Sequence, residues 1–280
     1  MKSPYLNLAM ALFLVLFSAQ AALAHSLFIQ STRYQVHKGK KAPLYFGWGH
    51  HIPLDDGIQG KKLRYIKVTS PDGEIQDLGI REGRGLHSHT IAYDQEGTWM
   101  LCSETNPGYY TIFTDKKGKE RHAIKSLSKV KDRAAKVHLS LLAKQFTKTY
   151  VACKAPSAKP LPRSGQYLEL VPSDNLFSLV PGDTLGFKVY LDGKPYEGEG
   201  SWDASFGGYS TINEDMFHGK TQSKDGRFEV AVPHAGEWYV RYNIRIPAPE
   251  SEKENYRELT LSASTVFLVS TPDKDKTQMN

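Results

Sequence analysis

The sequence predicts a mainly β protein made of two Ig-like β-sandwich domains with one short helical segment. Short alternating apolar segments recur in both halves, turn residues separate them, and a stretch rich in proline and small residues divides the chain. The predicted N-terminal domain covers residues 25–155, the linker 156–164 and the C-terminal domain 165–270.

In the first half, the expected strands alternate as half-buried strands do. They cover residues 44–48, 63–69, 87–92, 98–103 and 109–113. Turn residues separate several of them, as in Ser70-Pro71-Asp72-Gly73 and Asn106-Pro107-Gly108.

The period of the pattern changes between residues 126 and 146. Val130, Ala134, Val137 and Leu141 recur at intervals of three and four residues. One face of an amphipathic helix has this spacing, so the sequence predicts the helical segment here.

The second β domain begins after a proline-rich stretch, residues 154–165, which cannot hold a strand ladder. The expected strands cover residues 167–171, 184–191, 227–232 and 238–246. Turns at Asp192-Gly193-Lys194 and Asp225-Gly226 fit this division.

The first 24 residues have the three parts of a secretory signal peptide. Lys2 is followed by an apolar run over residues 8–17, and Ala22 and Ala24 fit a cleavage site. Cleavage after Ala24 makes His25 the first residue. The rest of the chain, with its polar tail at 271–280, has no apolar run long enough to span a bilayer, so we expect export without stable membrane insertion.

The formal net charge of +6 falls to +5 when Lys2 is removed. The basic residues look scattered among acids, which argues against nucleic acid as a partner. Cys102 and Cys153 are the two cysteines of the chain. An oxidising compartment favours a disulfide between them; a metal-bound thiolate pair is the alternative.

His25 is a candidate metal ligand because of its predicted position. At a free N-terminus, the α-amino nitrogen and the ring Nδ1 of one histidine can chelate a single ion. Imidazole suits nickel, cobalt, copper and zinc. The alternative is that a histidine follows the cleavage site by chance.

Two further histidine pairs are candidate ligands. His50-His51 follow Gly49 and precede a proline, where a strand end lets either ring reach an ion. His87 and His89 have the spacing that puts both rings on one face of a strand. Packing or solvent exposure is the alternative for both pairs, and we expect the other histidines to be structural or surface groups.

Asp55 and Asp56 follow the first histidine pair and are expected to solvate a turn, with an oxygen ligand as the alternative. Signatures of a serine nucleophile elbow, a phosphate-binding loop and a catalytic cysteine are absent from the sequence. Most aromatic residues are expected in the core, although Trp48, Tyr109 and Tyr110 could line a site.

Several motifs together resemble the exported DUF4198 proteins. The resemblance covers nearly the whole mature chain, and its C-terminal motifs are turn and strand markers of many Ig-like modules. The matching motifs are Ala24-His25-Ser26-Leu27-Phe28, Gly49-His50 with Pro53 and Asp55-Asp56, Glu96-Gly97-Thr98-Trp99, Gly165-Gln166-Tyr167-Leu168-Glu169-Leu170-Val171-Pro172, Pro181-Gly182-Asp183, Asp192-Gly193-Lys194-Pro195, Asp225-Gly226-Arg227-Phe228 and Ala235-Gly236-Glu237-Trp238.

The family looks like the periplasmic auxiliary component of energy-coupling-factor nickel and cobalt transporters. The resemblance therefore implies a periplasmic metal-binding protein with membrane transporter subunits as partners. It carries over His25 and the His50-His51 pair, but not His87 and His89, and it leaves the metal open between nickel or cobalt and, less expected, copper or zinc.

The alternative function is an enzyme. A mature N-terminal histidine and one further histidine are also the copper ligands of histidine-brace monooxygenases, which act on polysaccharides and use β-sandwiches. A third alternative is a structural interaction domain that binds no metal.

Overall fold

Strands make up nearly all of the regular structure in the computed structural model, which describes residues 25–157 and 161–271. The predicted signal peptide, residues 158–160 of the predicted linker and residues 272–280 of the predicted tail lie outside the described residues. Within the two described ranges, no helix has the length and apolar character that crossing a membrane requires.

The strands and short 3₁₀ helices follow one another along the described chain as follows: β1 (Ser26–Ser31), β2 (Gln35–Val36), β3 (Lys40–Gly49), β4 (Ile58–Gln59), η2 (Gly60–Lys62), β5 (Leu63–Thr69), β6 (Ile75–Asp77), β7 (Arg84–Gly85), β8 (Ser88–Tyr93), β9 (Gly97–Thr105), β10 (Gly108–Asp115), β11 (Glu120–Ala123), η3 (Leu127–Lys129), β12 (Ala134–Cys153), β13 (Leu168–Pro172), η4 (Leu176–Ser178), β14 (Asp183–Leu191), β15 (Lys194–Pro195), β16 (Gly200–Phe206), β17 (His218–Ser223), β18 (Arg227–Val232), β19 (Gly236–Pro247), η5 (Glu250–Glu252) and β20 (Glu258–Val269).

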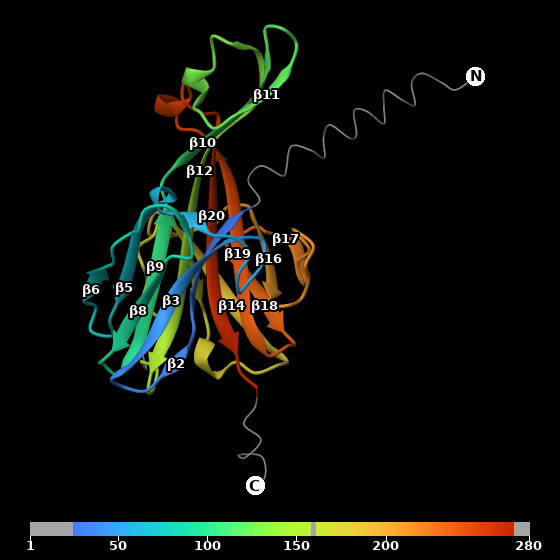
Figure 1. Cartoon of the computed structure of the whole chain (residues 1–280). Coiled ribbons are helices and arrows are strands. Elements are labelled where there is room, and N and C mark those ends of the chain that lie inside the picture. The colour runs from blue at the N-terminus through green and yellow to red at the C-terminus, as the bar shows by residue number, and fades with distance from the viewer. Residues whose placement is uncertain (1–24, 158–160, 272–280) are drawn as a thin grey trace.

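One long sheet runs through both halves of the chain, in the order β17-β16-β19-β20-β12-β9-β5-β6 (Figure 1). β12 is its central strand. It pairs antiparallel with β9 and β10 and parallel with β20. The sheet therefore crosses the boundary that the sequence suggests between two domains.

Two smaller sheets pack on opposite faces of the long sheet. Alternation along β12 shows this, because Val151 and Cys153 belong to the core under β1-β3-β8, whereas Phe146 and Tyr150 belong to the core under β13-β14-β18. Each half thus has its own sandwich core, as the predicted fold class requires, and the two cores share β12.

The predicted strands match the structure well where alternation is clear. β5 and β18 have the predicted bounds, and β3, β8, β9, β10, β13, β14 and β19 each contain most or all of a predicted segment. The sequence prediction omits β1, β12, β16, β17 and β20, as well as the short strands β2, β4, β6, β7, β11 and β15.

The amphipathic helix predicted over residues 126–146 is wrong. Only the three-residue η3 is helical there, and β12 begins at Ala134. Val137, Leu139 and Leu141 also fit a period of two, and Thr147 and Thr149 favour strand. Pairing with β10, β9 and β20, which are distant in sequence, decides between the two periods.

The predicted disulfide is also wrong, since Cys102 and Cys153 are both free and buried. Cys153 lies opposite Gly97 on β9, five residues before Cys102, which is about 17 Å along a strand. A disulfide needs Cα atoms within about 7 Å. Burial raises the pKa of Cys102 to about 12, so it is a thiol rather than a metal-binding thiolate at neutral pH.

The basic residues are less scattered than the sequence suggests. The end of β10, β11 and the start of β12 project beyond the sandwiches (Figure 1). This arm, residues 115–136, carries nine Lys or Arg residues and three Asp or Glu residues. Its net charge of +6 equals that of the whole chain, so the positive charge is concentrated here.

Candidate metal-binding site

His25 and His50 lie side by side because β1 and β3 pair in a defined register. Ser26 lies opposite Gly49 at the end of this antiparallel pair, so the next residues outward, His25 and His50, also face each other. Their ring centroids are 4.8 Å apart. The exposed His25 ring also stacks on Trp48, with centroids 6.0 Å apart and planes at 8°.

The turn after β3 depends on Gly49. A Cβ at this position would lie 2.3 Å from Asp55 Oδ2, and its φ of +150° also favours glycine. The close approach lets Asp55 Oδ2 accept the backbone N–H of His50 at 2.8 Å. Asp55 thus acts in the turn, as expected, and fixes the backbone of the site.

The buried side chain of His50 is held through one ring nitrogen. Its Nδ1 lies 2.5 Å from Glu214 Oε1, and its backbone carbonyl accepts a hydrogen bond from the Tyr239 hydroxyl at 2.7 Å. Glu214 lies in the β16–β17 loop, so it approaches His50 from the second half of the chain. With Nδ1 engaged, Nε2 is the ring nitrogen left for another partner.

Arg241 on β19 holds Glu214 and Ser26 in place beside His50. Its guanidinium donates to Asp203 at 2.7 and 2.9 Å, to Glu214 Oε2 at 3.1 Å and to Ser26 Oγ at 3.1 Å. Both Arg241 and Asp203 are buried. The network therefore connects β1, β16 and β19 to the carboxylate that holds His50.

The charges of the network favour a carboxylate at Glu214. Burial alone would raise the pKa of Glu214, but the Arg241 guanidinium and the His50 ring lower it below its ordinary value. Burial alone would lower the pKa of Arg241, but Asp203 and Glu214 raise it above its ordinary value.

The neutral form of His25 is favoured. Partial burial, followed by the neighbouring His50, lowers the pKa of His25. The carboxylates of Asp55 and Asp56 oppose this shift. A neutral imidazole is the form that can donate an electron pair to a metal.

The other predicted ligands lie elsewhere or are arranged differently. The His51 ring is 6.3 Å from that of His50, and its buried Nε2 has no hydrogen-bond partner in the described chain. His87 Nε2 lies 3.0 Å from the carbonyl of Ile58. His89 lies opposite Leu44, about 16 Å along β3 from Gly49.

The structure thus brings His25 and His50 together, places His51 beside them and separates His87 and His89 from them. Asp56 forms an ion pair with Arg84. Within residues 25–157 and 161–271, no group of three or more His, Cys, Asp or Glu side chains is arranged to hold a metal ion. The His25 and His50 imidazoles are the two rings that lie side by side at this position.

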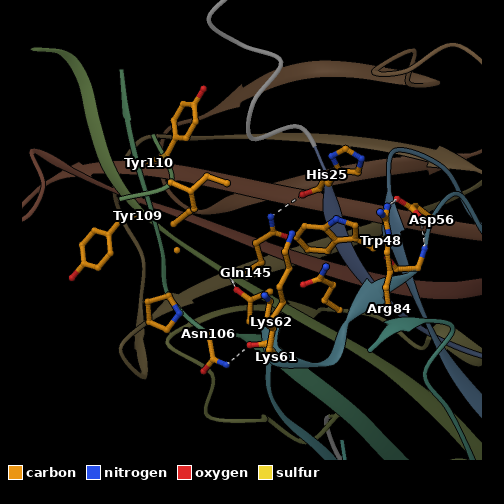
Figure 2. A pocket seen from close by; sticks show the side chains of 17 residues that line it. His25, Trp48, Asp56, Lys61, Lys62, Arg84, Asn106, Tyr109, Tyr110 and Gln145 are labelled. Carbon is orange, nitrogen blue, oxygen red and sulfur yellow. Dashed lines mark hydrogen bonds and ion pairs between the residues drawn. The ribbon is translucent and has the colours of Figure 1, made fainter. Parts of the chain in front are cut away.

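A pocket of about 720 Å³ adjoins His25. Trp48, Tyr109 and Tyr110 all line it, together with Lys61 and Lys62. Figure 2 shows the two tyrosines on one side of the view and His25 with Trp48 on the other. The aromatic residues that the sequence suggests for a site do share one pocket.

Sequence reasoning missed Glu214, Arg241 and Asp203. Glu214 is 164 residues from His50 in the sequence, and Arg241 is 215 residues from Ser26. No local motif marks them. The signal available is Arg241 between Val240 and Tyr242, within the buried run of β19, since a buried charge needs a partner.

Comparison with known proteins gives one family. Residues 22–246 match the family model described as a domain of unknown function, DUF4198. No curated protein is similar in sequence.

Some solved structures are similar at low identity. They include Escherichia coli alpha-2-macroglobulin activated by porcine elastase (13% identity, TM-score 0.24, covering 88% of this chain and 20% of that chain). Salmonella alpha-2-macroglobulin reacted with methylamine has 14% identity and a TM-score of 0.23, over 88% of this chain and 15% of that one. The Escherichia coli adhesin FdeC has 13% identity and a TM-score of 0.22, over 86% and 64%. The chain thus spans a fifth or less of the two macroglobulins.

Proposed function

The chain belongs to the DUF4198 family, and from this premise we propose that it is an exported periplasmic protein that binds nickel or cobalt and delivers the ion to a membrane transporter. The observation that carries the proposal is the contact between His25 and His50, whose rings lie 4.8 Å apart at the paired ends of β1 and β3. The ion is the cargo of the protein.

Three nitrogen donors would bind the ion. Cleavage after Ala24 would free the α-amino group of His25, which chelates together with its own imidazole. His50 would add its Nε2, because Glu214 occupies Nδ1. A carboxylate that accepts from the second nitrogen of a ligating histidine is a common outer partner in metal sites, where it fixes the ring and raises its basicity.

The donor set also fits a carrier rather than a permanent metal site. Imidazole and amine nitrogens suit nickel and cobalt. His25 is exposed at the edge of the fold, so an ion bound there remains accessible to a partner. Copper would bind such nitrogens more tightly than nickel, so affinity rank by itself does not identify the cargo.

Calorimetry with nickel, cobalt and copper tests the proposal on mature protein whose first residue is verified by mass spectrometry. One residue added before His25 turns the amine into an amide and should weaken nickel binding at least about tenfold. His50→Ala should have a similar effect and His51→Ala a smaller one. His138→Ala, on an exposed β12 position, is the matched control and should leave affinity unchanged.

Failure of the mature protein to bind nickel or cobalt would overturn the proposal, and so would either of two further results. One is unchanged nickel affinity in both the extended protein and His50→Ala. The other is sustained oxidation of polysaccharide when the copper-loaded protein receives a reductant and oxygen, which would favour the copper monooxygenase reading.

A further inference from the structure

The pocket beside His25 has the size and position of a binding site for a small organic molecule. Its volume of about 720 Å³ falls within the range of about 300–1,000 Å³ that ligand sites occupy. His25 forms part of its wall, so a molecule in the pocket would reach the ion that we propose for His25 and His50.

Two ammonium groups line this pocket without a carboxylate partner. Among the described residues, neither Lys61 nor Lys62 forms an ion pair, whereas Arg84 is neutralised by Asp56. Lys62 Nζ lies 4.5 Å from the centroid of the Trp48 ring. Partial burial, followed by the nearby Arg84, lowers the pKa of Lys62, and the Asp56 carboxylate opposes this shift.

Two of the three amide side chains in the pocket wall are already engaged. Gln145 accepts from the backbone N–H of Leu27 and donates to the carbonyl of His25. Asn106 donates to the carbonyls of Lys61 and Leu63. The ammonium groups, the Gln59 amide and the faces of Trp48 and Tyr109 are thus the main features that a ligand would recognise.

We propose that this pocket binds the organic part of an anionic metal chelate, a polycarboxylate complex of the ion, so that the cargo reaches His25 and His50 already chelated. Lys61 and Lys62 would bind carboxylates that face away from the ion, and Trp48 and Tyr109 would flank the carbon skeleton. Two ammonium groups favour an anionic complex over a bare dication. This inference rests on the proposed function.

Calorimetry with three probes tests it: Ni²⁺ in a non-coordinating buffer, citrate alone and the nickel–citrate complex. The wild-type mature protein should bind the complex more tightly than citrate. Lys61→Gln/Lys62→Gln should weaken binding of the complex at least about tenfold and change the affinity for bare Ni²⁺ less than about twofold. Lys188→Gln/Lys194→Gln, on exposed positions of β14 and β15, is the matched control.

The outcomes distinguish failure of the pocket inference from failure of the proposed function. If bare Ni²⁺ binds but the complex binds no more tightly than citrate, or the lysine variant binds the complex like wild type, the pocket inference is wrong and the proposed function stands. If bare Ni²⁺ does not bind, the proposed function is wrong, and the pocket inference that rests on it is wrong as well.

The projecting arm supports a second, independent inference. It holds a net charge of +6 over residues 115–136, and the adjoining segment 249–257 adds three acids and two bases, so the end of the molecule keeps a net charge of +5. Leu127 N–H donates to the carbonyl of Asn255, which joins the two segments. Ile124, within the arm, is 86% exposed.

We infer that this arm binds the surface of an anionic phospholipid membrane. Clustered Lys and Arg residues are attracted to anionic headgroups by about 1 kcal/mol each, and an exposed isoleucine among them can enter the headgroup layer. The combination of basic charge with an exposed apolar side chain favours a lipid surface, which has an apolar layer beneath its anionic headgroups, over nucleic acid.

Vesicle sedimentation of the mature protein tests this contact. We expect binding to vesicles of phosphatidylcholine mixed with phosphatidylglycerol, little binding to phosphatidylcholine alone, and release at high salt. Lys116→Glu/Lys117→Glu should weaken binding at least about tenfold. Lys188→Glu/Lys194→Glu changes the net charge equally and should have a much smaller effect.

No binding to mixed vesicles at low salt would overturn the inference, as would equal loss in the two charge-reversal variants. Binding to soluble polyglutamate without binding to mixed vesicles would assign the arm to an acidic protein partner and also overturn it.

Discussion

Glu214 orients the His50 ring through one short hydrogen bond. Its Oε1 lies 2.5 Å from His50 Nδ1, and its Oε2 accepts from Arg241 at 3.1 Å. Arg241 is in turn held by the buried Asp203. A single exposed loop residue therefore couples His50 to a rigid ion pair in the core.

Glu214→Gln tests this positioning role. Removing the charge weakens the acceptor at Nδ1, so nickel affinity should fall about tenfold, the lower end of the usual range for such outer partners. The ¹⁵N NMR shifts of the His50 ring should show a changed tautomer population. Glu229→Gln, an exposed carboxylate on β18, is the control, and equal affinities of the two variants would refute the role.

About half of the candidate site could be predicted from the sequence, by considering its residues one at a time. His25 stands out through its place after the predicted cleavage site, and His50 through its neighbours Gly49 and His51. The contact between them depends on the β1–β3 register, which sequence patterns do not specify. Glu214 could not be found at all, because its role depends on a loop that meets His50 only in the folded chain.

At the level of elements, strands with clear alternation and strong turns were predictable. β18 alternates exposed and buried residues along its whole length, and β5 alternates from Ile66 to Thr69. β12 was not predictable, because several of its apolar positions also fit a helical period. Burial on both faces of this central strand weakens the alternation that would have identified it.

In the whole molecule, a buried ion pair joins the long sheet to the β13-β14-β18 sheet that packs on it. Lys148 on β12 and Glu169 on β13 contact at 2.7 Å, with side chains 1% and 0% exposed. Burial alone would raise the pKa of Glu169, but the Lys148 ammonium and donors from Ser164 lower it below its ordinary value. The sequence does not predict this contact, because it depends on how two different sheets pack.

The pair should make stability depend on pH. Because the pKa of Glu169 is lower when folded, its contribution is present above the unfolded value of about 4.3 and is lost as pH falls through the folded value. Glu169→Gln should cost about 3–5 kcal/mol of unfolding free energy at pH 7 by urea denaturation, and the difference from wild type should narrow below about pH 4.

A double variant provides the control. Lys148→Met/Glu169→Leu removes both charges and should be less destabilised than Glu169→Gln, because no charge remains buried alone. A pH-independent difference between wild type and Glu169→Gln would show that the carboxylate does not act through its charge.

The parallel ladder between β12 and β20, from Leu141 to Thr149 on β12, has a mechanical consequence for cargo exchange. Rotating one sandwich against the other would break the hydrogen bonds of this ladder, so the described part of the chain disfavours a hinged opening between the two sandwiches. An ion held by His25 and His50 would then leave by exchange at the rim, at a rate set by its own ligands and by whichever surface comes to meet them.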